Sequence, residues 1–126
     1  MRAVDTNVLL RLIVRDDTRQ VALAQNFIAK GAWVSVLALA ETVWVLSTVY
    51  HLDSPELIKV IGMLLSHREL TLQEPEVVRS ALDLFRARPT LGFSDCLMLR
   101  LAQKAGHLPL GTFDKSLAKL EGTQRL

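Results

Sequence analysis

The chain has 126 residues, of which 50% are hydrophobic and 22% are charged. This length allows one hydrophobic core, so we expect a single domain over residues 1–126, and the composition excludes a disordered chain. Cys96 is the only cysteine, which excludes an internal disulfide and a cysteine-based zinc site and favours a reducing, cytoplasmic compartment. No basic segment followed by an apolar core opens the chain, so we expect no signal peptide.

The N-terminal part of the chain alternates short β-prone runs with helical spacing of apolar residues. Strands are expected at residues 2–4, 32–36 and 70–72. Helices are expected at about 8–13, at 19–30 after the N-cap signal Asp16-Asp17-Thr18, at 37–50, and at 54–67 with Ser54 as N-cap and Pro55 next to it.

The C-terminal part continues the same alternation. Helices are expected at 75–86, 94–104 and 114–120, a loop at 89–92, a brief strand at 108–111 and a short edge strand at 122–126. Strands that alternate with helices predict an α/β fold, here a three-layer α/β/α sandwich with a central, mostly parallel sheet.

Residues 32–50 are apolar apart from a few hydroxyl groups and Glu41. An acid at the centre of a membrane span costs roughly 2.5–3.5 kcal/mol, and the segment is expected to begin as a strand, so we expect no membrane insertion. The helix at 37–50 is hydrophobic almost all round and is expected to lie deep in the protein. The aromatic residues at core-like spacing are expected to be packing residues: Phe27, Trp33, Trp44 and Phe85.

Asp5 and Asp114 each follow an expected strand and precede an expected helix. Ligands of parallel sheets bind beyond the carboxyl ends of the strands, so both aspartates are placed at that edge. Taken singly, each could be an ordinary N-cap, a task that Thr6 or Thr112 could share.

Glu41 belongs to the same edge, because it lies near the start of the helix that leaves the second strand. Its neighbours at helical spacing include Leu37, Trp44 and Val45, which predicts a buried carboxylate. Such a group needs a cation, strong hydrogen-bond donors or a catalytic role; a structural pair with a buried arginine is the alternative.

Asp95 starts a helix yet has Met98 and Leu99 at helical spacing, which places it on the apolar side. The alternative is an acid that stabilises the helix N-terminus by ~0.3–1 kcal/mol, with Ser94 as cap. Four acids in one pocket cannot all ionise without compensating positive charge, which a divalent cation would supply. Oxygen ligands without clustered histidines favour Mg²⁺ or Mn²⁺ over zinc, and such a site suits phosphodiester hydrolysis.

The distribution of charge is consistent with a nucleic-acid substrate. The chain has 15 basic and 13 acidic residues; without the four site acids, 13 − 4 leaves 9, and 15 − 9 leaves +6 outside the pocket. A scattered, solvated surface explains the same counts. Candidate phosphate contacts are Arg11, Arg15, Arg86 and Arg88, although an ordinary solvated face is the alternative for each pair.

Four motifs together resemble the PIN domain family, and most closely its VapC-like ribonuclease toxins. They are Val4-Asp5-Thr6-Asn7-Val8-Leu9, the lone helical Glu41, Gly92-Phe93-Ser94-Asp95-Cys96-Leu97 and Thr112-Phe113-Asp114. The order and spacing fit the family over nearly the whole chain. One departure is Ser94, where the family often has alanine.

The resemblance implies a Mg²⁺-dependent endoribonuclease, with Mn²⁺ as a possible substitute, that cuts structured RNA such as tRNA or rRNA. It implies that Asp5, Asp95 and Asp114 bind metal and that Glu41 binds metal or orients the attacking water. Site-supporting residues would be Thr6, Asn7, Ser94 and Thr112. The implied partners are a VapB-like antitoxin and a second copy of the chain in a homodimer.

Three other classes of protein fit these residues less well. A phosphoacceptor receiver domain needs an aspartate at the end of a central strand, where this chain has Leu37-Ala38-Leu39-Ala40-Glu41. A phosphatase of the haloacid-dehalogenase type needs an aspartate at the position of Asn7. A catalytically inactive PIN-like binding module would not need all four acids.

Overall fold

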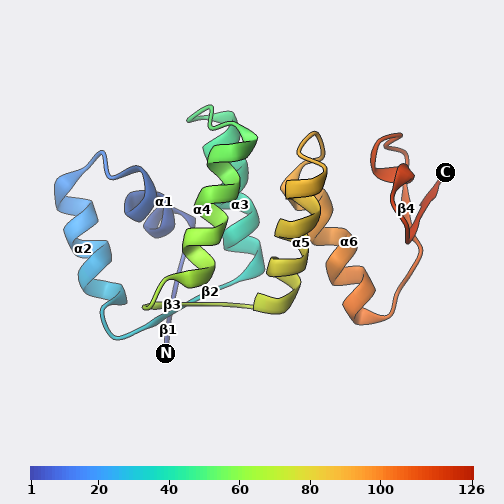
Figure 1. The fold of residues 1–126 in the computed structure, drawn as a ribbon. Helices are drawn as coiled ribbons and strands as arrows, with labels where there is room; N and C mark the ends of the chain where they lie inside the picture. The colour runs from blue at the N-terminus through green and yellow to red at the C-terminus, as the bar shows by residue number, and fades with distance from the viewer. The chain divides into compact units, whose positions relative to one another are not determined.

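A computed structural model describes all residues, 1–126. The chain forms two compact units, unit 1 (Met1–Pro75) and unit 2 (Glu76–Leu126). Figure 1 shows three strands and helices α1 to α4 in unit 1, and helices α5 and α6 followed by a small strand pair in unit 2.

Unit 1 is built on a three-stranded parallel sheet in the order β1-β2-β3. The strands are β1 (Arg2–Val4), β2 (Ala32–Val34) and β3 (Leu70–Leu72), and Val4 lies opposite Val34, which lies opposite Leu72. The parallel pairing requires crossovers, which the helices provide: α1 (Thr6–Val14) and α2 (Thr18–Ile28), then α3 (Val36–Thr48) and α4 (Ser54–Ser66). The carboxyl ends of all three strands therefore point to one edge of the sheet.

The helices of unit 1 begin at side chains that accept hydrogen bonds from the first turn. Asp17 caps α2 and accepts from the backbone N–H of Gln20 at 3.0 Å. Asp53, and not Ser54 as expected from the sequence, caps α4 and forms a reciprocal capping box with Glu56. The correction has a simple cause, since the Asp53 carboxylate reaches the third helical residue while Ser54 is already helical.

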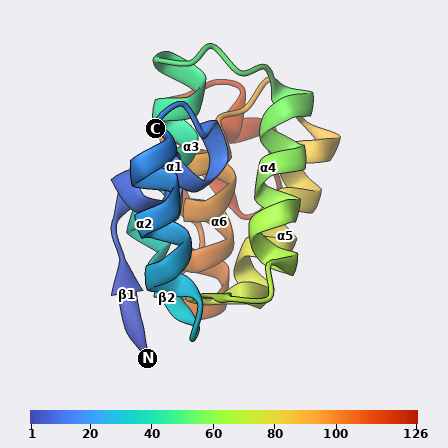
Figure 2. The ribbon, with the colours of Figure 1, turned by 90° about the vertical axis from the view of Figure 1, so that its left-hand side faces the viewer.

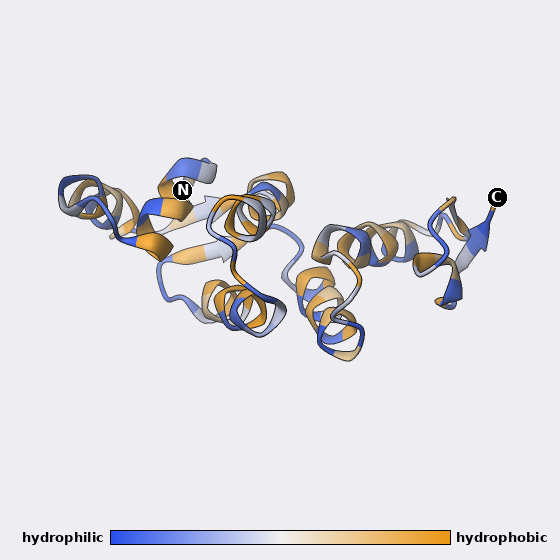
Figure 3. Ribbon diagram, turned by 90° about the horizontal axis from the view of Figure 1, so that it is seen from above, coloured by the Kyte–Doolittle hydropathy of each residue, from blue (hydrophilic) through white to orange (hydrophobic).

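The core of unit 1 consists of apolar side chains from the strands and from one side of each helix. Leu9, Leu46 and Ile61 are fully buried, as are Ala32 and Val34 of the central strand. Seen from above and coloured by hydropathy, the helices carry hydrophobic and hydrophilic residues in alternation along the chain, as amphipathic helices do (Figure 3).

Unit 2 contains α5 (Pro75–Ala87, starting at the last residue of unit 1), α6 (Phe93–Ala105) and a two-stranded parallel sheet of β4 (Leu110–Thr112) and β5 (Thr123–Arg125). Phe85 and Phe93 meet edge to face, with ring centroids 5.9 Å apart. The helix expected at 114–120 is wrong: only a 3-10 turn, η1 (Leu117–Lys119), forms. Residues 113–122 must carry the chain back to pair β5 beside β4, which leaves no length for a full helix.

The fold class expected from the sequence is confirmed, since the structure is a mixed α/β fold with a parallel sheet flanked by helices. The expectation of one domain over residues 1–126 stays a prediction. None of the helices has the length and apolar character needed to cross a membrane.

Candidate active site

Asp5 lies where β1 ends and α1 begins, at the carboxyl edge of the unit 1 sheet. It is the N-cap of α1, and its Oδ1 accepts a hydrogen bond from the backbone N–H of Val8 at 3.1 Å. The side chain is exposed. The helix therefore fixes the position of this carboxylate while leaving it open to solvent and to a ligand.

Glu41 lies on α3, and the prediction that it is buried is wrong, because Glu41 is exposed. Leu37 and Trp44, one turn away on either side, are 76% and 63% exposed. The reason is that α3 buries the opposite side, with Thr42, Leu46 and their neighbours against the rest of unit 1. Glu41 thus shares an open helix face with two large apolar side chains.

Two of the four aromatic residues expected to pack in the core do not do so. Trp44 is 63% exposed and Trp33 is 37% exposed, whereas Phe85 is buried and Phe27 is half-buried. Trp33 alternates with the buried Ala32 and Val34 along β2, so it points to the other side of the strand.

The N-terminus of α3 is held by two side chains. The Ser35 hydroxyl oxygen accepts from the N–H of Ala38 at 3.0 Å, and Gln73 Oε1 accepts from the N–H of Val36 at 2.9 Å. Gln73 itself follows β3, and its backbone N–H donates to the carbonyl of Val34 at 2.8 Å. The carboxyl ends of β2 and β3 are thereby tied to the helix that carries Glu41.

In unit 2, Asp95 occupies the first turn of α6. The residue at the N-cap is Gly92, with no side-chain cap, so the alternative role of Ser94 as cap does not occur. Partial burial, and then the negative charge of Asp114, raise the pKa of the Asp95 carboxyl above its ordinary value. Asp95 is therefore held near a second carboxylate in surroundings that disfavour its charge.

Asp114 follows β4, as expected from the sequence. Its Oδ1 accepts from the backbone N–H groups of Ser116 at 2.8 Å and Leu117 at 2.9 Å, which starts the 3-10 turn. Its own N–H donates to Thr112 Oγ1 at 3.0 Å. The side chain is exposed, so the turn orients it without enclosing it.

The four sequence-predicted acids are thus divided between the units, with Asp5 and Glu41 in unit 1 and Asp95 and Asp114 in unit 2. Of the four, Asp95 and Asp114 interact electrostatically. Neither unit by itself contains three or more His, Cys, Asp or Glu side chains placed to hold a metal ion. The electrostatics of unit 2 nevertheless fit a cation, because burial and then the charge of Asp114 disfavour the charged form of Asp95, and a positive ion would offset that cost. Of the expected supporting residues, Thr6 and Asn7 start α1 beside Asp5.

Cys96 is next to Asp95 but is a fully buried core residue. Burial, followed by the charge of Asp95, raises the pKa of its thiol to about 11. A thiol with such a pKa is protonated at neutral pH, so Cys96 is excluded as a nucleophile.

The arginines suggested as phosphate contacts lie in different surroundings. Arg11 pairs with Asp16 at 2.7 Å, and Arg86 pairs with the exposed Asp83 at 3.3 Å. Arg15 ends α1 in a left-handed conformation, and Arg88 is exposed in the loop after α5. Their roles in RNA binding stay predictions.

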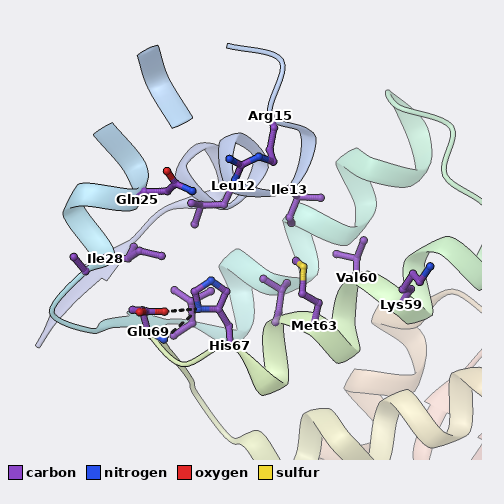
Figure 4. A pocket seen from close by; sticks show the side chains of 13 residues that line it. Leu12, Ile13, Arg15, Gln25, Ile28, Lys59, Val60, Met63, His67 and Glu69 are labelled. Carbon is purple, nitrogen blue, oxygen red and sulfur yellow. Dashed lines mark hydrogen bonds and ion pairs between the residues drawn. The ribbon is translucent and has the colours of Figure 1, made fainter. Parts of the chain in front are cut away.

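Unit 1 also has two cavities that sequence patterns did not indicate. Cavity A, about 570 Å³, is lined by residues of α1, α2 and α4, including Leu12, Ile28 and Met63, with His67 and Glu69 at one end (Figure 4). His67 Nδ1 lies 3.3 Å from a carboxylate oxygen of Glu69. Figure 2 shows α1 and α2 together with α4, the helices that line it.

Cavity B, about 380 Å³, lies between α1 and α2 and is lined by residues that include Asp5, Asn7, Arg11, Gln20, Leu23 and Phe27. It therefore begins at one of the four acids. No residue pattern predicts it, because it depends on how the two helices pack.

These observations define a class: a mixed α/β protein with acidic residues at the ends of parallel strands. The chain matches the PIN domain family over residues 2–122, nearly its whole length, and it belongs to that family. PIN domains are generally nucleases. The search of curated proteins and the search of solved structures each gave no match.

Proposed function

We propose that this protein is a Mg²⁺-dependent endoribonuclease whose metal-binding residues are Asp5, Glu41, Asp95 and Asp114. The observation that carries the proposal is the membership of the chain in the PIN family over residues 2–122, with Asp5 after β1 and Asp114 after β4 oriented by backbone hydrogen bonds. Burial, and then the charge of Asp114, raise the pKa of the Asp95 carboxyl in addition. A divalent cation would offset the cost of the charged form of Asp95.

The residues have separable tasks in this proposal. Asp5, Asp95 and Asp114 hold the metal, and Glu41 holds it or orients the attacking water. When bound, the metal polarises the phosphoryl oxygen and lowers the pKa of the attacking water. The N-terminus of α1 and the turn after β4 orient two of the carboxylates, Asp5 and Asp114, before substrate binds, which reduces the reorganisation needed during cleavage.

Purified protein is expected to cleave RNA with Mg²⁺ or Mn²⁺ and to lose the activity with a chelator. Asp5→Asn should reduce cleavage by roughly a hundredfold or more, because it removes a metal-binding charge while its side-chain oxygen can still cap α1. Cleavage would be followed on labelled RNA with both proteins prepared in parallel. Equal rates for the two proteins at matched purity would refute the proposed mechanism.

We further propose that the enzyme is the toxin of a VapBC-type pair, with a VapB-like antitoxin and a homodimeric assembly, and that it cuts tRNA or rRNA in the cytoplasm. Expression of the chain alone is expected to slow bacterial growth, whereas expression of Asp5→Asn is not. Mapping RNA 5′ ends after brief induction of both would identify the substrate. Undisturbed growth with the active enzyme would argue for RNA processing without a toxin role.

A further inference from the structure

Cavity B combines apolar walls with free amide groups. Leu23, Ala24 and Phe27 of α2 form the apolar part, and Asn7 and Gln20 contribute side-chain amides that make no hydrogen bond to the rest of the protein. Its volume of about 380 Å³ lies within the range of small-molecule sites, about 300–1,000 Å³. An apolar slot with a few polar groups at its edge suits a flat heterocycle that carries donors and acceptors.

The walls of cavity B are held in place by other contacts. The guanidinium of Arg2 lies 3.9 Å from the centroid of the Phe27 ring, and Arg2 Nη2 donates to the Phe27 carbonyl at 3.0 Å. Arg11, also on the lining, is fixed by its 2.7 Å ion pair with Asp16. Two lining side chains, Phe27 and Arg11, therefore have limited freedom, which lowers the entropic cost of binding a ligand against them.

Cavity B lies next to Asp5, one of the four proposed metal-binding acids. Asp5 lies on the lining, so a ligand in the cavity lies beside one of the proposed metal-binding carboxylates. We propose that cavity B binds one unpaired nucleobase of the RNA, next to the phosphodiester that is cut; this rests on the proposed nuclease function. The base enters with its edge toward the amides of Asn7 and Gln20 and its face toward Leu23 and Phe27.

Hydrogen bonding of the base edge to the amides of Asn7 and Gln20 requires an unpaired base. In a duplex the Watson–Crick edge of each base is occupied and the base is stacked, whereas a base in a loop or bulge can turn outward. Stacking of a base on an aromatic side chain is worth about a 5- to 150-fold change in affinity. Cavity B would thus direct cleavage to single-stranded positions of a folded RNA and confer a preference for certain bases.

Binding to cavity B can be measured without metal and without cleavage. Isotope-labelled protein in chelator would be titrated with the four nucleoside 5′-monophosphates and followed by NMR. We expect shifts of the side-chain amides of Asn7 and Gln20 and a difference in affinity among the four bases. Leu23→Trp, which fills the cavity from an exposed position, should weaken binding at least about tenfold.

The matched control is Ala22→Trp, an exposed residue of the same helix that does not line the cavity and should leave binding unchanged. Shifts confined to cavity A, or equal binding by Leu23→Trp, would overturn the base site. A second readout is the base preference next to the cut in a randomised RNA, which Leu23→Trp should relax. If nucleotides bind cavity B but no RNA is cut, the nuclease proposal fails, and cavity B stands only as a nucleotide-binding site without a cut phosphodiester beside it. If RNA is cut with unchanged preference by Leu23→Trp, only the base site fails.

Discussion

Asp95→Asn is expected to abolish RNA cleavage and, in the same protein, to increase the free energy of unfolding at neutral pH without metal. The loss of activity should be roughly a hundredfold or more, because a metal-binding charge is removed. The gain in stability follows from the raised pKa of Asp95, which means that folding disfavours its charged form. Asparagine carries no charge, so the cost disappears.

The sign of the pH dependence follows from the same shift. The folded state binds the Asp95 proton more tightly than the unfolded state, whose pKa is near 3.8. The wild-type free energy of unfolding therefore falls as the pH rises from about 3.8 through the raised folded pKa, and this contribution is absent from Asp95→Asn. Denaturant unfolding at several pH values, with and without Mg²⁺, would measure it; added Mg²⁺ should stabilise the wild type more than the variant.

Asp83→Asn is the matched control, because Asp83 is an exposed aspartate of unit 2 that forms only a surface pair with Arg86. It should change neither cleavage nor the pH dependence of unfolding. An Asp95→Asn protein that cleaves RNA at the wild-type rate would contradict the role of Asp95, and one that is less stable at neutral pH would contradict the electrostatic cost.

Leu46→Ala is expected to destabilise the protein by about 2–5 kcal/mol, whereas Trp44→Ala should cost no more than about 1 kcal/mol. Leu46 is fully buried on the inner side of α3, while Trp44 is 63% exposed on the side that carries Glu41. Truncating a tryptophan in a core would cost about 3–5 kcal/mol of the free energy of unfolding. A small cost for Trp44→Ala beside a large cost for Leu46→Ala therefore distinguishes the exposed side of α3 from its buried side.

The measurement is the midpoint and slope of urea unfolding for both variants, with Thr42→Val as a further probe of the inner side. Thr42 is buried, and its hydroxyl donates to the carbonyl of Ala38 at 2.7 Å. Equal destabilisation by Leu46→Ala and Trp44→Ala would mean that the face around Glu41 is covered.

The sequence located most elements because strong local signals mark their ends. Gly31 closes the second helix region with a positive φ of 94°, Asp17 caps α2, and Pro75 starts α5. These signals act within a few residues of the chain and do not depend on tertiary packing. The strand expected at 70–72 has the same bounds in the structure, Leu70–Leu72.

The expectations that are wrong concern features that tertiary packing determines. Helix α3 is hydrophobic on most sides, so its pattern does not tell which side is buried, and Glu41 was assigned to the wrong environment. The final helix was expected from its own residues, but the pairing of β5 with β4 limits that segment to a turn. The nearness of Asp95 to Asp114 and the shape of cavity B likewise depend on contacts between segments distant in the sequence.

Residues 123–126, which include the short strand β5, help to position the carboxylate of Asp114. The N–H of Leu126 donates to the Thr112 carbonyl at 2.9 Å. The Leu126 side chain packs close to Gly111, where an added Cβ would lie 3.6 Å from it. Thr112 in turn orients Asp114. In a genetic selection for loss of activity, nonsense mutations at Thr123 should therefore be recovered together with substitutions of Asp114. A tag fused directly after Arg125, in place of Leu126, should weaken the enzyme.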